Sequence, residues 1–470
     1  MTTPLTSHPW FFCGIGGSGM LPLALILRGA GAQVSGSDRS FDQGRTPEKF
    51  AWLQTLGFQL YPQDGSGLTS PAQTLVASAA VEDTVPEVIR ARALGCPRLT
   101  RAQLLSQLFN AAPRSIAIGG TSGKSTVTGM VGWILTQTGQ DPTIMNGAVM
   151  KNFVAPDAPF ASARVGAGGL FVSEVDESDG SIALYHPSVA VLNNVSLDHK
   201  SLEELRALFG AFLARAPIAA INLDDPETAA LAPHAQSLIT FGLTSPSADL
   251  TIQPGSITPS PTSITATLLD RRSGDTHPLA LQIPGLHNLA NALAALAASA
   301  ATGLPLAEAT AALASFTGLA RRFDIVGTSP QGITVIDDFG HNPDKVAATL
   351  KTLKAHPGRI IALFQPHGYG PLRQMGAELA QTFAQILAPD DLTILTDPVY
   401  FGGTVDRSQG SDRITTLITQ AGKTALHIPT RTAAAQHIAQ IAQPGDRIAI
   451  MGARDDTLTL FARDLLSTLS

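Results

Sequence analysis

The strongest chemical signal in this sequence is a glycine-rich segment that ends in a lysine and two hydroxyl residues. It runs from Gly119 to Thr126 as GGTSGKST, after an apolar stretch and before a helix-forming one. This order is what a phosphate loop needs, because backbone N–H groups at a helix N-terminus bind phosphate oxygens. Nucleotide phosphates would contact Gly120, Thr121, Gly123, Lys124, Ser125 and Thr126. The usual loop has glycine where this chain has Ile118, and a chance glycine-rich turn is the alternative.

Lys124 would reach the β- and γ-phosphates of such a nucleotide, and Ser125 would coordinate Mg²⁺. Four carboxylates, Glu174, Asp176, Glu177 and Asp179, follow the apolar stretch 170–173 within six residues, although only 14% of the chain is charged. Such a cluster suits a divalent metal or a substrate with an ammonium group, and a solvated loop is the alternative.

A second apolar stretch, Val189–Leu192, is followed by Asn193, Asn194, Asp198 and His199. Polar residues at the carboxyl ends of parallel strands face the ligand crevice in open α/β sheets. The phosphate loop and these two strand ends together predict Mg²⁺–nucleotide chemistry. Taken alone, His199 is equally compatible with a structural histidine.

The N-terminal segment Gly14–Gly19 fits the G-x-G-x-x-G pattern, with Gly16, Gly17, Ser18 and Gly19 in the turn and Asp38 further on. This is a dinucleotide fingerprint, but the same turn can hold any diphosphate. A redox cofactor is disfavoured because the chain already carries an ATP-type loop. Asp38 would meet a ribose or a base, or is a plain turn residue.

Four later clusters also combine residue types that form sites, although each is compatible with a capped turn. They are His287–Asn291, Arg321–Arg322, Asp337–Pro343 and Gln365–Tyr369. Asparagine is unfavourable inside a helix without a polar partner, which draws attention to Asn291. The last two clusters both follow predicted strands.

Alternating strands and helices must position these groups, and they predict three α/β domains in series with mainly parallel sheets. Strands are expected at 11–14, 33–35, 74–78, 115–118, 170–175, 189–192, 333–336, 359–364, 392–395 and 447–450. Helices are expected at 20–29, 47–56, 85–94, 99–109, 125–138, 290–301 and 306–316. Residues 244–283 alternate polar and apolar positions, which predicts an antiparallel meander. The predicted domain ranges are 1–110, 111–317 and 318–470.

Composition excludes several classes of protein. The chain has 470 residues, of which 44% are hydrophobic, and a net charge of −6. With this charge it has no overall positive potential that would attract nucleic acid or an anionic membrane. No run of about 18 apolar residues predicts a membrane span. Cys13 and Cys96 form neither a disulfide framework nor a metal motif, which favours a reducing cytoplasm.

Taken together, these motifs resemble those of the Mur ligase family, which makes amide bonds in peptidoglycan precursors. The resemblance covers nearly the whole chain and is most specific toward ligases that add L-alanine to UDP-N-acetylmuramate. The matching segments are 14–20 (GIGGSGM), 34–38 (VSGSD), 78–81 (SAAV), 176–179 (DESD), 287–292 (HNLANA), 320–323 (ARRF), 337–343 (DDFGHNP) and 364–369 (FQPHGY).

The resemblance implies a Rossmann-like UDP-sugar domain, a central P-loop ATPase domain and a C-terminal Rossmann-like domain on the amine side. UDP-sugar contacts would come from Gly16, Gly17, Ser18, Gly19, Asp38 and Ser78. Lys124, Glu174, His199 and His341 would be catalytic, with Ser125, Glu174 and His199 holding Mg²⁺, two ions in all. His287, Asn291, Arg322 and Asp338 would contact ATP, and His341 would lie near the incoming amine.

Several positions depart from the family motifs. Ser125 stands for a threonine but keeps the hydroxyl, and segments 397–407 and 452–455 differ from their counterparts. Four further departures change a functional group. Ser122 and Asn342 stand where the family has an imidazole, Phe339 replaces a tyrosine, and Gly368 replaces an arginine. Most departures fall in the third domain, so they bear on the amine more than on the nucleotide. Asn193–Asn194 resembles the relative that attaches a preformed tripeptide in cell-wall recycling.

Three hypotheses therefore stay open. The first is a cytoplasmic ligase, monomeric or homodimeric, that joins L-alanine or a similar amine to UDP-N-acetylmuramate through an acyl phosphate. The second is a ligase of the same chemistry with a peptide or another amine as acceptor. The third is a non-catalytic protein that binds nucleotide or UDP-sugar as a regulator.

Overall fold

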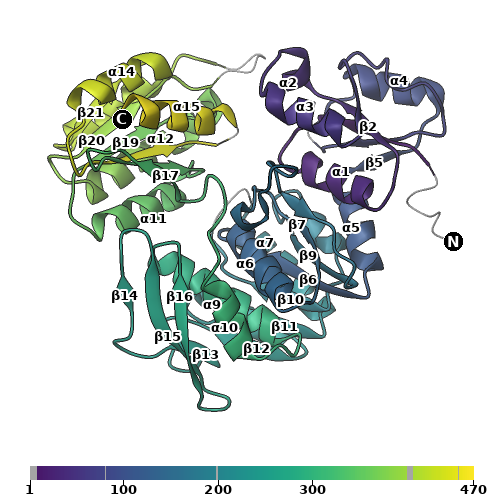
Figure 1. The fold of residues 1–470 in the computed structure, drawn as a ribbon, viewed down its shortest axis with the longest axis horizontal. Helices are drawn as coiled ribbons and strands as arrows, with labels where there is room; N and C mark the ends of the chain where they lie inside the picture. Colours follow the sequence, from purple (N-terminus) through teal and green to yellow (C-terminus); the bar gives the residue numbers. More distant parts are fainter. Residues whose placement is uncertain (1–7, 80, 197–199, 400–405, 454, 470) are drawn as a thin grey trace. The chain divides into compact units, whose positions relative to one another are not determined.

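The computed structural model describes residues 8–79, 81–196, 200–399, 406–453 and 455–469. These residues form three β-sheets, with helices connecting their strands (Figure 1). The N-terminal and central sheets lie in one compact unit, which comprises 1–258, 265–282 and 288–318. A second unit comprises 259–264, 283–287 and 319–470 and contains the C-terminal sheet. No helix in the described part of the chain is long and apolar enough to cross a membrane.

The N-terminal sheet has five parallel strands in the order β3-β2-β1-β4-β5. Its strands are β1 (Trp10–Cys13), β2 (Val34–Ser37), β3 (Gln59–Tyr61), β4 (Thr74–Ala77) and β5 (Arg98–Thr100). Its helices are α1 (Met20–Gly29), α2 (Arg39–Asp42), α3 (Pro47–Thr55), α4 (Pro86–Leu94) and α5 (Arg101–Ala111). The strand order reverses between β1 and β4, and ligands bind at the carboxyl ends of strands at such a reversal.

The three inner strands of this sheet, β2, β1 and β4, are fully buried. All four residues of each (VSGS, WFFC and TLVA) are buried, as expected for parallel strands covered on both faces. Gly14 follows β1 with a φ of +78°, a conformation that glycine adopts without steric cost. The chain therefore turns sharply after β1 and enters α1 through a short glycine loop.

The central sheet has eleven strands, with β6 (Arg114–Gly119) between β9 (Leu170–Glu174) and β10 (Val189–Leu192). Its other parallel strands are β7 (Thr143–Met145), β11 (Ile218–Asn222), β12 (Leu238–Phe241) and β13 (Leu250–Ile252). At the edges, β8 (Ala163–Arg164) is antiparallel to β7 and β15 (Ile264–Asp270) is antiparallel to β13. Two further strands, β14 (Thr258–Pro259) and β16 (Thr276–Leu281), pair with β15.

The helices of this part begin with α6 (Lys124–Gln137), which follows β6 directly. The others are α7 (Leu202–Arg215), α8 (Pro226–Leu231), α9 (Leu286–Ala300) and α10 (Leu306–Leu313). Short 3₁₀ helices are η1 (Lys151–Phe153), η2 (Ser181–Leu184) and η3 (Ala232–His234). In the parallel register Gly119 lies opposite Leu192 and Ile118 opposite Glu174, so three strands end side by side.

The C-terminal sheet has the order β17-β18-β22-β19-β20-β21, and only β17 runs antiparallel to its neighbour. Its strands are β17 (Asp324–Thr328), β18 (Thr334–Asp338), β19 (Ile360–Phe364), β20 (Leu392–Leu395), β21 (Thr424–His427) and β22 (Arg447–Met451). Its helices are α11 (Pro343–Lys354), α12 (Tyr369–Ile386), α13 (Ser411–Gln420), α14 (Arg431–Ile441) and α15 (Thr457–Thr468). Two apolar clusters on opposite faces of this sheet form its core.

The α/β class and the predicted strands are confirmed, with ends that differ by one or two residues. The antiparallel meander within residues 244–283 is also confirmed. Eight further strands were not predicted, namely β3, β5, β7, β8, β11, β12, β17 and β21. The predicted domain ranges stay predictions, since the two compact units do not define where the first and second domains meet.

Candidate active site

The phosphate loop lies between β6 and α6, and its conformation depends on two glycines. Gly120 has a φ of +128° and Gly123 a φ of +82°, which residues with side chains rarely adopt. A Cβ on Gly123 would lie 2.4 Å from Asn291 Oδ1 and 2.6 Å from Asn193 Nδ2. The predicted site residue Asn291 thus lies directly against the loop.

Two asparagines at the end of β10 hold this loop in place. Asn194 Oδ1 accepts hydrogen bonds from the Ser122 N–H at 2.8 Å and the Thr121 hydroxyl at 2.9 Å. Asn194 Nδ2 donates to the Ser122 carbonyl at 3.0 Å, and Asn193 Nδ2 donates to the same carbonyl at 3.1 Å. Asn193 also donates to Asn291 Oδ1 at 3.0 Å. The sequence placed these asparagines at a strand end but gave no hint of this supporting role.

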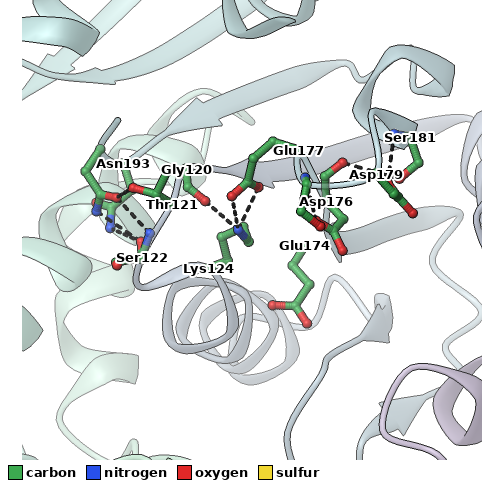
Figure 2. Close-up of polar contacts among 12 residues, drawn as sticks. Gly120, Thr121, Ser122, Lys124, Glu174, Asp176, Glu177, Asp179, Ser181 and Asn193 are labelled. Carbon is green, nitrogen blue, oxygen red and sulfur yellow. Dashed lines mark hydrogen bonds and ion pairs between the residues drawn. The ribbon is translucent and has the colours of Figure 1, made fainter. Parts of the chain in front are cut away.

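Lys124 is bound by the protein through three contacts. Its ammonium donates to the Gly120 carbonyl at 2.6 Å and to Glu177 Oε2 at 2.7 Å and Oε1 at 3.0 Å (Figure 2). Burial raises the pKa of Glu177, although the charge and hydrogen bonds of Lys124 oppose this effect. The sequence identified Glu177 as one of four clustered carboxylates and as part of the DESD segment, but it did not predict the contact with Lys124.

The residues predicted to hold Mg²⁺ are brought together as far as the structure describes them. Ser125 Oγ donates to Glu174 Oε2 at 2.7 Å, and a Cβ on Gly147 would lie 2.3 Å from Glu174 Oε1. A hydroxyl and a carboxylate at this spacing are hard oxygen ligands that fit Mg²⁺. His199 lies outside the described residues, and among the residues described no group of three His, Cys, Asp or Glu could hold a metal.

The N-terminal glycine loop places its predicted contacts at the reversal of the first sheet. Asp38 Oδ2 accepts from the Gly16 N–H at 2.8 Å, and its Oδ1 accepts from the Ser40 N–H at 2.8 Å. Asp38 therefore shapes the loop and caps α2, so contact with a ribose or base stays a prediction. Gly17 and Ser18 are exposed at the loop, and Ser78 directly follows β4.

In the second unit, Asp338 organises the segment around Arg322 and His341. Asp338 Oδ2 accepts from the Phe323 N–H at 2.7 Å, and Oδ1 accepts from the Gly340 N–H at 2.7 Å and the Thr349 hydroxyl at 3.0 Å. Arg322 Cζ lies 4.8 Å from the centre of the Phe339 ring. Phe339 therefore keeps the ring contact that a tyrosine would make and lacks only the hydroxyl.

The other departures from the family motifs have local explanations. Asn342 caps α11 by accepting from the Lys345 N–H at 3.0 Å, a position that favours asparagine. Gly368 has a φ of +153°, which favours glycine where the family has an arginine. Ser122 contributes its backbone to the contacts with Asn194, and nothing in the structure explains the choice of its side chain. His287, whose ring lies against Gly285, also belongs to this unit.

His341 is held as a neutral imidazole. Its Nδ1 lies 3.0 Å from the Phe339 carbonyl, which can only accept, so the neutral ring carries its proton on Nδ1. Burial and the charges of Lys345, His367 and Arg322 lower the pKa of His341 to about 3, although the bond to Phe339 opposes this. His367 lies edge-on at 5.2 Å between ring centres.

This depressed pKa predicts a pH dependence of stability. Between pH 6.5 and about 3 the unfolded chain binds a proton at residue 341 that the folded chain does not bind. The contribution of His341 to the free energy of unfolding is therefore complete above pH 6.5 and is lost as the pH falls toward 3. We expect the drop in free energy of unfolding from pH 7 to pH 5, measured by urea titration, to be smaller in His341→Asn than in the unmodified chain. A matched His186→Asn change at an exposed site should leave the drop unaltered, and equal drops in all three proteins would contradict the assignment.

Comparisons with known proteins match all three parts of the chain. Residues 11–112 match the family model described as "Mur ligase family, catalytic domain", 118–299 the "Mur ligase middle domain", and 321–454 the "Mur ligase, glutamate ligase domain". A UDP-N-acetylmuramate–L-alanine ligase from Pelotomaculum thermopropionicum is 33% identical over 455 residues, which are 94% of each chain. The corresponding ligase of Thermosynechococcus vestitus is 35% identical and covers 95% of this chain and 93% of its own.

Solved structures give the same result for the fold. A UDP-N-acetylmuramate–alanine ligase from Thermotoga maritima superposes with a TM-score of 0.81 at 26% identity and covers 98% of both chains. A murein peptide ligase from Psychrobacter arcticus superposes with a TM-score of 0.72 at 24% identity, covering 98% of this chain and 99% of its own. The second likeness concerns the fold alone.

Proposed function

Because the chain belongs to the Mur ligase family, whose members are ATP-dependent amide ligases that use Mg²⁺, we propose that it joins the carboxylate of UDP-N-acetylmuramate to L-alanine. ADP and phosphate are the other products, and the amide enters a peptidoglycan precursor. The observation that carries the proposal is the cluster of Lys124, Ser125 and Glu174 beside the phosphate loop. Relatives named for this reaction match the chain nearly from end to end, which supports the same conclusion.

The reaction has two covalent steps. A carboxylate oxygen of the sugar attacks the γ-phosphorus of ATP, the bond to the β-phosphate oxygen breaks, and ADP leaves with that electron pair. The neutral amine of alanine then attacks the acyl carbon, and phosphate leaves with the electrons of the C–O bond while the nitrogen loses a proton. Phosphate leaves an acyl carbon far more readily than the oxide that a free carboxylate would have to lose. The carboxylate must therefore first be phosphorylated.

Lys124 supplies positive charge where phosphate charge develops in the first step. The glycine loop contributes N–H groups that are already oriented, so little reorganisation is needed when charge builds up. To reach a phosphate, Lys124 must exchange at least one of its contacts with Glu177 and Gly120. We assign Asn193 and Asn194 the task of keeping the loop in its binding shape.

Ser125 and Glu174 would hold one Mg²⁺, and Glu174 with His199 a second. When bound, Mg²⁺ neutralises phosphate charge and orients the phosphate groups. Glu174 lies on a strand directly beside the strand that precedes the loop, so it is fixed by the sheet register. The number of ions is part of the proposal.

His341 would serve the amine side, whereas Arg322 would contact ATP. With its proton on Nδ1, neutral His341 presents Nε2 as a hydrogen-bond acceptor, which suits an incoming amine. We further propose a cytoplasmic location, where ATP and the UDP-sugar are found, and a monomer or homodimer.

The experiment that tests this function measures phosphate release by the purified protein with ATP, Mg²⁺, UDP-N-acetylmuramate and a panel of amines. We expect release with L-alanine, and with no other single proteinogenic amino acid at a comparable kcat/KM. Mass spectrometry should then show the UDP-sugar heavier by one alanyl residue.

The same panel separates the other hypotheses. Release only with a tripeptide or another amine would replace L-alanine by that acceptor and leave the ligase chemistry in place. Binding of the UDP-sugar without phosphate release for any amine would contradict an enzymatic role and favour a regulator.

A further inference from the structure

Arg101, the first residue of α5, lies between the glycine loop of the first sheet and the acidic loop that follows β9. A Cβ on Gly19 would lie 3.0 Å from Arg101 Cδ, 3.4 Å from Nε and 3.5 Å from Nη1. On the other side, Arg101 Nη2 lies 3.8 Å from Asp176 Oδ2 and 4.0 Å from Asp179 Oδ2. One guanidinium therefore lies near both loops of the first unit.

Local structure fixes Arg101 in this place. Thr100 caps α5 with a capping box in which its hydroxyl accepts from the Gln103 N–H at 3.1 Å and its own N–H donates to Gln103 Oε1 at 2.8 Å. Eight residues after Arg101, Phe109 packs edge-on against Phe171 and Tyr185, with ring centres 5.6 Å and 5.2 Å apart. Both ends of α5 are thus anchored, so the arginine is not a loosely attached surface residue.

The contacts of Arg101 leave its hydrogen-bonding capacity unused. Within the described residues its guanidinium makes no hydrogen bond, and both carboxylates lie beyond the usual 3.2 Å. Its side chain is 23% exposed, and a guanidinium carries five N–H donors that match phosphate oxygens. The loop beside it has N–H groups at Ser18 and Gly19 that donate to no described residue.

Both carboxylates have other hydrogen bonds that do not involve Arg101. Asp176 Oδ1 accepts from the Ser178 hydroxyl at 2.7 Å, and Asp179 Oδ1 accepts from the Ser181 N–H at 2.9 Å. Burial would raise the pKa of Asp176, but the bonds from Ser178 and the charges of Lys124 and Arg101 lower it overall. The acidic loop would therefore keep its local geometry if the guanidinium turned away from it.

We propose that Arg101 binds the diphosphate of the UDP-sugar together with the glycine loop, and that Asp176 and Asp179 compete with the diphosphate for its guanidinium. The proposal rests on the assignment of the first domain to a UDP-sugar. Occupation of that site then changes the charge around the loop that carries Glu177, the partner of Lys124.

The test measures the affinities of UDP and of uridine for the full-length protein by calorimetry and ligand-observed NMR. Arg101→Gln should weaken UDP by about tenfold or more, as expected for a lost charge-assisted hydrogen bond. It should leave uridine unchanged, because uridine has no phosphate. Arg101→Lys keeps the charge but not the planar fork and should lose less.

Two further variants test the direction of the change in UDP affinity. Asp179→Asn keeps the oxygen that accepts from Ser181 but removes a competing charge, so it should bind UDP more tightly, by about twofold to fivefold. Arg92→Gln, at an exposed arginine paired with Asp83, is the matched control and should bind UDP as the unmodified chain does. A purely structural ion pair would instead make Arg101→Gln and Asp179→Asn change UDP affinity in the same direction.

Three results would overturn the proposal. They are unchanged UDP affinity in Arg101→Gln, an equal loss for UDP and uridine, and a weakening by Asp179→Asn. Each of these leaves the ligase assignment untouched. If the unmodified chain bound neither UDP nor uridine, the UDP-sugar domain itself would be wrong and the role of Arg101 with it.

Discussion

Lys124→Ala should abolish phosphate release with every amine, to a level at least about 10³-fold below the unmodified chain, because charge stabilisation of a transferring phosphoryl group is a large catalytic term. The ammonium lies over the loop, within hydrogen-bond distance of the Gly120 carbonyl and Glu177. Alanine leaves the glycine loop, its asparagine supports and the first sheet intact. Coupled ADP detection under saturating ATP measures the loss.

Binding of UDP separates loss of function from loss of fold in this variant. The Lys124→Ala protein should bind UDP within about twofold of the unmodified affinity. The reason is that the predicted UDP contacts follow strands of the first sheet, whereas Lys124 follows β6 of the central sheet. Lys351→Ala, at an exposed position of α11, is the matched control and should retain full turnover. Persistent ATP turnover in Lys124→Ala would show that the loop is not the phosphate site.

Glu174→Gln is expected to lower kcat/KM by about 10³-fold, since a metal ion contributes several kcal/mol of charge stabilisation. Glutamine keeps the shape of the side chain, and its amide oxygen can still accept from Ser125, but the negative charge is gone. The metal should therefore bind more weakly, so higher Mg²⁺ concentrations should restore part of the activity. A Mg²⁺ titration at fixed ATP measures this shift.

A second measurement tests the same assignment without turnover. Mg²⁺ should raise the Tm of the protein with a non-hydrolysable ATP analogue, and this increment should shrink in Glu174→Gln. Glu203→Gln, at an exposed site in the first turn of α7, provides the control. If Glu174→Gln kept the Mg²⁺ midpoint of the unmodified chain, Glu174 would not be a metal ligand.

Much of the fold could be predicted because buried parallel strands appear in the sequence as short apolar runs. The run before Gly119 and those before Glu174 and Asn193 identified the three strands around the phosphate loop. Strands β3 and β5 escaped because each has only three residues and none of them is buried. Their positions follow from pairing with β2 and β4, which is tertiary information.

The candidate site was predictable in its residue types but not in its contacts. Spacing alone showed a lysine after glycines and carboxylates after a strand, which was enough to predict phosphate and metal chemistry. It could not show that Glu177 binds Lys124 or that Asn194 binds Ser122, because these partners lie 53 and 72 residues apart. Contacts of this kind are set by which strands become neighbours, and one sequence read alone does not contain that order.

The asparagine support of the loop has a consequence for synthesis of the protein. The hydrogen bonds between the loop and Asn193 or Asn194 span 71 to 73 residues, so closing them costs loop entropy that only the docking of β10 beside β6 offsets. A growing chain that ends before residue 193 already contains the whole GGTSGKST motif yet lacks the groups that shape it. We therefore expect the nascent protein to bind ATP only after residues 189–194 have been synthesised and β10 has docked beside β6.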